Sequence, residues 1–385
     1  MKIFHTSDWH LGRMLYGRSL LADQTFFIEQ VFMPQIEEES PDLIIIAGDI
    51  YDRPIAPTEA IELFDRFLTA MARKKIPVAV IAGNHDSAER MAIGKEMLRQ
   101  NGIYIATNLD DAQIPLELEK DGEKLQVFLL PYLDTAVVRD YFHDDSLRGE
   151  SACMLRTIEL LKDKFEEDCT KLLVSHCFAA GALTSDSESG LWVGGSGAVS
   201  PDIWRDFDYV ALGHLHRAQK SGERARYAGS PLTYSVDEQH HHKSFVKLKL
   251  SKGIFTHELI PVKPLRAVRR ISGEFEDLIE EGRLFLQQNL KPIEDYVELE
   301  LLDQKPILLA AERLREYYPN LLAVTNRWVA EAASQQRENQ HKKQDDLTIF
   351  KSFLSDICHV EFGEEEEAWF RSVRKNWENR EVERQ

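Results

Sequence analysis

The sequence predicts an α/β fold in its first two thirds, followed by a smaller separate domain and a helical C-terminal segment. Three observations support this prediction. Apolar runs without polar alternation recur along the first part of the chain, which is typical of strands buried on both faces. Amphipathic helical patterns lie between the early runs, and the whole pattern changes near Pro264. With 385 residues, the chain is also longer than one ordinary domain.

Strand and helix patterns alternate in the first part of the chain. The expected strands cover residues 2–6, 43–47, 78–82, 172–174 and 209–212. The expected helices cover residues 20–39, 57–72 and 88–100, with proline and Asn-Gly at the breaks. From about Leu125 the pattern shifts to further strands, at 126–130, 226–228 and 244–250. We therefore expect an α/β core with a mixed second sheet.

The rest of the chain has the pattern of a small α+β domain and a tail. Its expected strands lie at 268–271, 296–301 and 321–324. Two short amphipathic helices, at about 347–359 and 364–383, end the chain, and so short a pair needs another surface to pack on. We predict domains at 1–264 and 265–332, a polar linker at 333–344 and a helical tail at 345–385.

Charge, apolar content and cysteine spacing limit the classes of protein to which the chain can belong. The formal net charge of -18 argues against a protein that holds nucleic acid by bulk electrostatics, because phosphate binding depends on Lys and Arg. No run of about 18 apolar residues occurs, and the first residues lack the pattern of an export signal. The four cysteines lack the paired spacing of disulfide or zinc sites. We expect a cytoplasmic protein.

Residue types that bind metals directly follow five of the expected strands. They are Asp8, His10, Asp49, Asn84, His176, His214 and His216. Ligands of open α/β sheets bind beyond the carboxyl ends of the strands, so we expect these side chains to meet at one edge of the sheet. A single Asp-x-His or His-x-His pair is more often structural, and Gly48-Asp49 alone is an ordinary turn. The ordered set of seven, however, predicts a metal centre.

The mixture of carboxylate, imidazole and amide groups suits a pair of metal ions. An Asp can bridge two cations, while a neutral Asn oxygen adds a ligand without adding charge. The two carboxylates offset only part of the charge of two divalent ions, and the remaining positive charge attracts phosphate. Two metals about 3.5 to 4 Å apart can activate a water and neutralise the attacking and leaving oxygens. The sequence therefore predicts a two-metal phosphodiesterase.

A candidate general acid lies beside this set. His85 directly follows Asn84, and histidine, with a usual pKa of about 6.5, can protonate a departing oxygen near neutral pH. Asp86 is available to orient the His85 ring. The alternative is that His85 only caps the following helix.

Four charged residues near the same strand ends are candidates for supporting roles. Asp52 could hydrogen-bond a metal-bound His or contact substrate, and the first role is favoured. Arg13, Arg53 and Arg90 could meet the phosphates of a substrate backbone. For each arginine, a solvated or ion-paired position on the surface is as good an explanation as a phosphate contact.

These motifs resemble those of the calcineurin-like metallophosphoesterases, over about the first 260 residues. The motifs are Asp8-x-His10, Gly48-Asp49-x-x-Asp52, Gly83-Asn84-His85-Asp86, His176 and Gly213-His214-x-His216. The resemblance implies a four-layer α/β/β/α sandwich. It also implies that one metal is bound by Asp8, His10, Asp49 and His216, and the other by Asp49, Asn84, His176 and His214. Sites of this composition suit manganese better than magnesium, although magnesium is possible.

Within this superfamily, Ser7-Asp8-Trp9-His10-Leu11-Gly12 and Gly229-Ser230-Pro231-Leu232 are similar to segments of the nuclease subunits of bacterial SbcCD complexes. The resemblance implies an exonuclease and endonuclease that cuts DNA ends, hairpins and single strands in repair and recombination. It also implies a homodimer, a capping domain, and a helical tail that binds the coiled coil of the ATPase SbcC. Such a partner could supply most of the DNA contacts, which would explain the acidic charge. Archaeal and eukaryotic relatives carry a second catalytic His where this chain has Asp52, so their role for that position does not transfer.

Two other functions stay open. Another calcineurin-like enzyme could use the same metals on a small phosphodiester, although such an enzyme needs neither the extra domain nor the tail. A scaffold without activity is the other alternative, and the complete set of ligand types argues against it.

Overall fold

The computed structural model describes residues 1–188, 197–287, 294–329, 347, 351, 363 and 366–374. The chain divides into two compact units, the first made of Met1–Arg270 with Glu294–Val297 and the second of Ile271–Ile293 with Glu298–Gln385. The predicted linker 333–344 lies outside the described residues, as does most of the tail, in which residues 366–374 are helical. The domain limits drawn from the sequence stay predictions.

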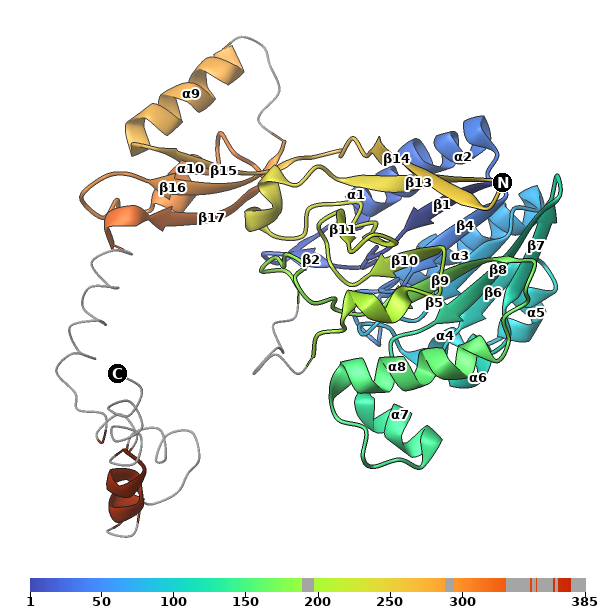
Figure 1. Ribbon diagram of the computed structural model, residues 1–385. Coiled ribbons are helices and arrows are strands. Elements are labelled where there is room, and N and C mark those ends of the chain that lie inside the picture. The colour runs from blue at the N-terminus through green and yellow to red at the C-terminus, as the bar shows by residue number, and fades with distance from the viewer. Residues whose placement is uncertain are drawn as a thin grey trace. The chain divides into compact units, whose positions relative to one another are not determined.

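Six strands form the first sheet, in the order β14-β13-β1-β4-β5-β6 (Figure 1). Their bounds are Ile254–Pro261, Ser244–Ser251, Lys2–Thr6, Leu43–Ala47, Val78–Ile81 and Ile103–Ala106. The last four run parallel, whereas β13 pairs antiparallel with both β1 and β14. All five residues of β4, with the sequence LIIIA, are buried, as expected for a central strand covered on both faces.

The second sheet also has six strands, in the order β11-β12-β10-β9-β8-β7. Their bounds are Gln219–Ser221, Ala225–Tyr227, Tyr209–Gly213, Thr170–His176, Glu123–Leu130 and Leu116–Lys120. The inner four are parallel and the two edge strands pair antiparallel with their neighbours. The sheet is therefore mixed, as predicted.

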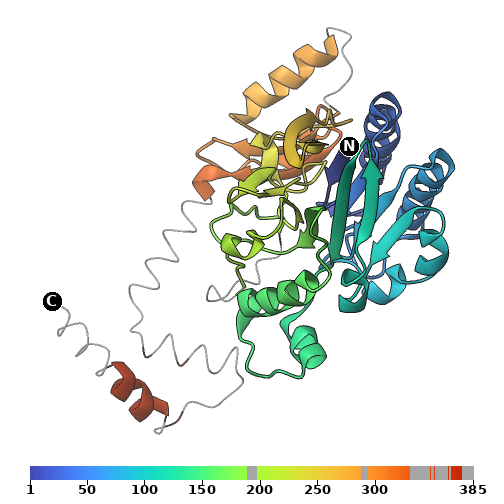
Figure 2. The same cartoon turned by 45° about the vertical axis from the view of Figure 1, so that its right-hand side comes forward.

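The two sheets of the first unit pack face to face and helices cover their outer faces. A buried apolar core between the sheets includes Ile45 and Ile81 from the first sheet and Val127 and Val174 from the second. The first sheet is covered by α1 (Leu21–Phe26), a π-helical turn (Phe27–Phe32), α2 (Met33–Glu39) and α3 (Thr58–Lys74), the blue helices of Figure 2. The second is covered by α8 (Gly149–Lys162), whose Ile158 packs in a separate core. This confirms the α/β/β/α sandwich.

Three expectations from the sequence were wrong in detail. The strands at 172–174 and 209–212 belong to the second sheet, and the strand at 244–250 belongs to the first. The expected helix at 88–100 is two short helices, α4 (Ala88–Met91) and α5 (Lys95–Arg99). The break falls at Gly94, whose φ of 73° is left-handed and ends the helical path. A strand pairs with partners that lie far away in the sequence. The apolar run of a strand therefore does not show which sheet the strand joins.

Smaller elements complete the first unit. They are β2 (Met14–Leu15), β3 (Arg18–Ser19), α6 (Leu109–Ala112), α7 (Thr135–Phe142), and 3-10 turns at Pro201–Trp204 and Val236–His240. In the described part of the chain, no helix has the length and apolar character needed to cross a membrane.

Trp9 fixes the segment that leaves β1. Its indole is 1% exposed and its nitrogen donates to the Thr6 hydroxyl at 2.9 Å. Four phenyl rings surround the indole edge-on at centroid distances of 5.1 to 6.1 Å, those of Phe27, Phe32, Phe64 and Phe67. Because these rings come from the π-helical turn and from α3, the outer helices hold the residues on either side of Trp9 in place.

A three-stranded sheet in the order β15-β16-β17 follows the sandwich. These strands are Val268–Gly273, Tyr296–Leu301 and Leu321–Asn326, with helices α9 (Phe275–Gln287) and α10 (Ala310–Leu314) between them. In the second unit, Phe275, Leu278, Leu314 and Tyr318 are buried, and the Tyr318 hydroxyl donates to the Leu278 carbonyl at 3.0 Å. The second unit thus has its own apolar core.

The aromatic cluster around Trp9 leads to a stability prediction. Replacing Phe67 with Ala should lower the free energy of unfolding of the first unit by about 3–5 kcal/mol, because a buried ring is lost and a cavity remains. Urea unfolding followed by tryptophan fluorescence measures this change. Glu62→Ala, on the exposed face of the same helix, should change it by less than about 0.5 kcal/mol. Equal effects of the two substitutions would contradict the assigned packing.

Candidate metal centre

The seven candidate ligands all lie at or just after the carboxyl ends of parallel strands. Asp8, His10, Asp49 and Asn84 follow strands of the first sheet, and His176, His214 and His216 end or follow strands of the second. The prediction that one sheet edge carries them all was therefore wrong, because two sheet edges contribute. Six of the seven are buried and Asn84 is half-buried.

Glycines bring the two sheet edges close together. A Cβ atom on Gly213 of β10 would lie 1.9 Å from the carbonyl oxygen of Ala47 in β4, so no other residue fits there without a shift of the backbone. The His176 Nδ1 atom lies 2.8 Å from the same oxygen, and a Cβ on Gly48 would lie 2.3 Å from that nitrogen. The ends of β4, β9 and β10 therefore meet at the Ala47 carbonyl.

The backbone is left-handed at four candidate ligands. The φ angles are 55° at Asp8, 44° at His10, 51° at Asp49 and 105° at His214. Non-glycine residues adopt this region rarely and at a cost of about 1–3 kcal/mol, and such residues cluster at functional sites. Hydrogen bonds hold the turns: the backbone N–H groups of Asp8 and His10 donate at 3.0 Å to the carbonyls of Gly48 and Asp49.

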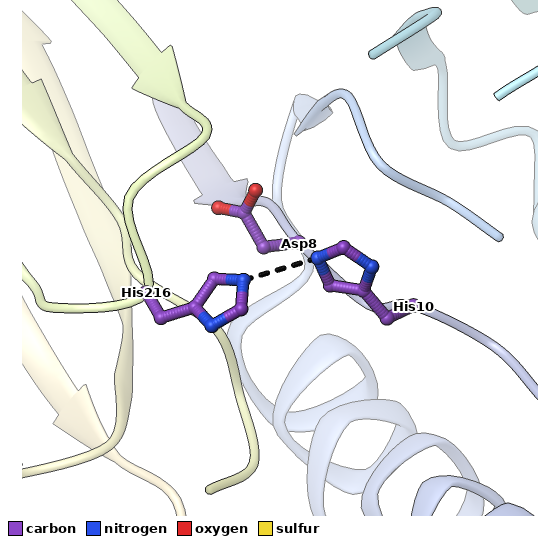
Figure 3. Close-up of side chains that lie close together, drawn as sticks. All are labelled: Asp8, His10 and His216. Atoms are coloured by element: carbon purple, nitrogen blue, oxygen red, sulfur yellow. Dashed lines mark hydrogen bonds between the residues drawn. The ribbon is translucent and has the colours of Figure 1, made fainter. Parts of the chain in front are cut away.

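Asp8, His10 and His216 form one compact group of potential ligands (Figure 3). One ligand atom of each lies within 4.8 Å of the others, and the two imidazole Nε2 atoms are 3.1 Å apart. Burial lowers the pKa of both histidines, which favours the neutral, metal-binding form. Burial raises the pKa of the Asp8 carboxyl, although the charge of His176 acts in the opposite direction.

Asp49, His176 and His214 form a second group, joined by Asn84. The Asn84 side-chain oxygen lies 2.9 Å from His176 Nε2 and 2.9 Å from His214 Nδ1. Because the Ala47 carbonyl accepts from His176 Nδ1, the other ring nitrogen, Nε2, faces the group. Burial acts to lower the pKa of His176, but the neighbouring Asp49 charge raises it to about 9.

Asp49 lies between the two groups. Its Oδ2 atom is 3.3 Å from His176 Nε2 and 3.6 Å from His10 Nε2. Burial acts to raise the pKa of Asp49, but the charge of His176 and their hydrogen bond lower it well below its usual range. A buried carboxylate facing imidazole nitrogens on both sides fits a bridging ligand of two cations, and the mixed nitrogen and oxygen donors fit divalent metals.

His85 lies beside both groups. Its backbone N–H donates to Asp49 Oδ1 at 2.9 Å, and its ring centroid is 4.8 Å from that of His10. The His85 Nδ1 atom lies 2.9 Å from the backbone carbonyl oxygen of Asp52, which orients the ring. The helix that follows is capped by Ser87, so capping by His85 is not its role.

The expectation that Asp86 orients His85 was wrong. Both Asp86 oxygens accept hydrogen bonds from the backbone N–H groups of Ile50, Tyr51 and Gly83, at 3.1, 2.9 and 2.8 Å. Asp86 therefore ties the loop after β4 to the loop after β5. This role could not be predicted from the sequence, because a carboxylate that accepts from backbone N–H groups has no sequence pattern of its own.

Asp52 and the three arginines differ in their surroundings. Asp52 Oδ1 is 3.0 Å from Arg13 Nη1 and 3.6 Å from His10 Nδ1. Arg13 is largely buried and also donates to the Ser187 carbonyl at 3.1 Å, so it joins two loops. Arg53 is 61% exposed, with its Nε 3.8 Å from Asp52, and Arg90 is exposed on α4.

Sequence reasoning missed three residues that surround His216. Glu238 Oε1 lies 3.0 Å from His216 Nδ1, and Glu188 Oε1 accepts from the His216 backbone N–H at 2.6 Å. The Tyr234 ring stands 5.4 Å from the rings of both His10 and His216 and forms a wall of the site. Glu188 and Glu238 lie in loop and 3-10 segments, where no strand pattern pointed to them.

The contact at Gly213 leads to a prediction. Gly213→Ala should destabilise the first unit and weaken divalent metal binding together, because the added methyl group pushes β10 away from the Ala47 carbonyl. Thermal unfolding and a metal titration measure the two effects. Gly122→Ala, at a left-handed turn with open space around it, should cost about 1–2 kcal/mol and leave metal binding unchanged. Normal metal binding by Gly213→Ala would count against this geometry.

Two beta-glucosidases are among the solved structures to which the chain is similar. A beta-glucosidase from Exiguobacterium marinum is 8% identical over 84% of this chain and 88% of its own, with a TM-score of 0.23. The psychrophilic beta-glucosidase BglU from Micrococcus antarcticus is 12% identical over 84% and 83%, with a TM-score of 0.22.

Most of the chain matches known protein families. Residues 264–357 match the SbcD C-terminal domain family, described as the type 5 capsule protein repressor C-terminal domain. The calcineurin-like phosphoesterase family matches residues 1–218, which carry all seven candidate ligands and more than half of the chain. Together the two matches agree with an SbcD-type subunit. The chain belongs to the calcineurin-like phosphoesterases, a family of metal-dependent phosphoester hydrolases.

Proposed function

We propose that this phosphoester hydrolase is a two-metal DNA nuclease, which cuts DNA ends, hairpins and single strands as the nuclease subunit of an SbcCD-type complex in repair and recombination. The observation that carries the proposal is the position of Asp49, whose Oδ2 faces His10 on one side and His176 on the other. A single metal would not need a carboxylate between two sets of ligands.

The proposed ligands divide into two sets that share Asp49. One ion would be held by Asp8, His10, Asp49 and His216, and the other by Asp49, Asn84, His176 and His214. Manganese suits these imidazole-rich sets better than magnesium. When bound, the ions supply a nucleophilic water and neutralise charge on the scissile phosphate.

His85 is the proposed general acid. The Asp52 carbonyl accepts the Nδ1 proton of His85, which leaves Nε2–H as the atom that can donate to the departing oxygen. Proton donation to the leaving group is worth about 10²–10⁴-fold in rate for a residue placed in this way.

Asp52 and the arginines take different proposed roles. The Asp52 carboxylate lies behind His10, with Arg13 held to it, so both serve to position rather than to react. The exposed guanidinium groups of Arg53 and Arg90 remain able to meet the phosphates of a polynucleotide.

DNA as the substrate and SbcC as the partner are supported by the C-terminal match. A phosphodiesterase for small molecules needs no second domain or tail, whereas residues 264–357 match the C-terminal domain of SbcD-type subunits. The net charge of -18 is compatible with DNA cleavage if a partner ATPase supplies most of the cationic contact surface. We propose that residues 345–385 bind the coiled coil of that ATPase.

An exposed apolar patch supports the proposed homodimer. The patch consists of Ile61 on α3 and Ile93 just before α5, which are 46% and 77% exposed. Ile61 and Ile93 line a groove together with the buried Phe64 and Met91. Adjoining exposed apolar side chains of this size favour an interface between two copies of the chain.

The catalytic proposal predicts that His85→Ala lowers the turnover of hairpin DNA with manganese by about 10²–10⁴-fold, while metal binding stays intact. Cleavage of labelled hairpin DNA measures the rate. The control is His143→Ala, which replaces an exposed histidine at the C-terminal end of α7. If the wild-type protein cuts only a simple phosphodiester, a small-molecule hydrolase is the correct assignment. Retained cutting by His85→Ala would remove His85 as the general acid.

The dimer proposal predicts that Ile93→Asp converts a dimer of the isolated chain to a monomer, because a charge would be buried at the patch. Light scattering after size-exclusion chromatography measures the mass. Ile254→Asp, at an isoleucine on β14 that is 66% exposed, is the matched control and should leave the dimer intact. A wild-type monomer at high concentration would contradict the proposal.

A further inference from the structure

We propose that Glu238 is the positioning residue for His216, so that one of the two metal sites depends on a buried carboxylate outside the ligand set. This inference rests on the metal pair of the proposed function and extends it to a residue that the motifs do not include.

The geometry of the His216 ring supports this role. Its Nδ1 atom lies 3.0 Å from Glu238 Oε1, and its Nε2 atom lies 3.1 Å from His10 Nε2 on the opposite side of the ring. A carboxylate accepts and cannot donate, so it selects the tautomer with the proton on Nδ1. The Nε2 lone pair then faces Asp8 and His10, where a metal ligand is needed.

A buried ion pair holds Glu238 in position. The side chain is fully buried in the 3-10 turn Val236–His240, and Lys243 Nζ lies 2.5 Å from its Oε2 atom. The same ammonium donates to the His216 carbonyl at 3.1 Å and to the Ser230 hydroxyl at 2.8 Å. Lys243 therefore contacts both the carboxylate and the backbone of the histidine, which makes the three groups one unit.

Two further hydrogen bonds hold the carboxylate oxygens of Glu238 in place. The Tyr234 backbone N–H donates to Oε2 at 3.3 Å, and the Ser187 hydroxyl donates to Oε1. The Ser187 oxygen also lies 2.7 Å from His216 Nδ1. With these contacts, Glu238 has donors at both oxygens, as expected of a carboxylate that is kept ionised inside a protein.

His176 offers a comparison within the same centre. Its Nδ1 atom faces the Ala47 backbone carbonyl at 2.8 Å, which selects the same tautomer without a full negative charge. A carboxylate behind an imidazole raises the basicity of the ligand nitrogen more than a carbonyl does. The site that uses His216 should therefore depend on the charge of Glu238, whereas the site that uses His176 should not.

Glu238→Gln keeps the shape and an acceptor oxygen but removes the charge. Loss of such a partner typically weakens metal binding by about 10–100-fold. We expect the variant to bind one manganese ion per chain as tightly as the wild type and the second at least about 10-fold more weakly. A loss confined to one of two sites is a result that general destabilisation would not produce.

The experiment is a manganese titration of the full-length chain, read by calorimetry and by the electron paramagnetic resonance signal of free Mn²⁺. Because Glu238→Gln leaves Lys243 buried and unpaired, the double variant Glu238→Gln/Lys243→Met is measured beside it. Asp111→Asn is the control, since Asp111 pairs with Lys95 at 2.5 Å and accepts from the Thr107 backbone N–H. Thermal unfolding of each variant reports stability separately.

The outcomes separate the two proposals. If the wild type binds two manganese ions and both Glu238 variants bind them with unchanged affinity, the positioning role is overturned. Equal weakening of both sites, or loss of the fold in both variants, also overturns it, because the pair would then serve the structure as a whole. A wild-type chain without a manganese pair would instead overturn the proposed function.

Discussion

The arrangement of this molecule depends on the close approach of two sheets at one backbone carbonyl, that of Ala47. Gly213 of the second sheet packs against this oxygen with no room for a side chain, and the His176 ring is bound to it at 2.8 Å. Strand ends from separate sheets can then place ligands in one small volume. Backbone packing, rather than long side chains, thus brings together residues that are far apart in the sequence.

The electrostatics of the centre follow from this crowding. Two buried carboxylates, Asp8 and Asp49, lie among the histidines of the centre. Burial lowers the pKa of His10, His214 and His216, whereas at His176 the charge of Asp49 outweighs burial and raises the pKa. Burying charges and bending four ligand residues into left-handed turns both cost free energy, which other parts of the fold must offset. The aromatic cluster at Trp9 contributes, because it anchors the segment between Asp8 and His10 in the outer core.

The strands of the sandwich could be predicted from the sequence, because continuous apolar runs are local signals, and the polar residues that follow these runs do lie close together. The sequence did not reveal that β9 and β10 form a different sheet from β1, β4 and β5, since pairing is decided by contacts far along the chain. The roles of Asp86 and Glu238 were also missed. Each is a single acid in an irregular segment, and its backbone and imidazole partners are visible only in three dimensions. The ligand assignments and domain limits stay predictions.

The π-helical turn Phe27–Phe32 sets how two aromatic rings of the outer helix meet the Trp9 indole. Both phenyl rings contact the Trp9 indole, at 5.8 and 5.9 Å, although five positions separate them. In a regular α-helix, positions five apart point about 140° away from each other. Regular α-helical winding of the same six residues would therefore turn one of the two rings off the indole, and the wider winding of the turn keeps both rings on it. The winding of this outer helix is therefore coupled, through Trp9, to the segment that carries Asp8 and His10.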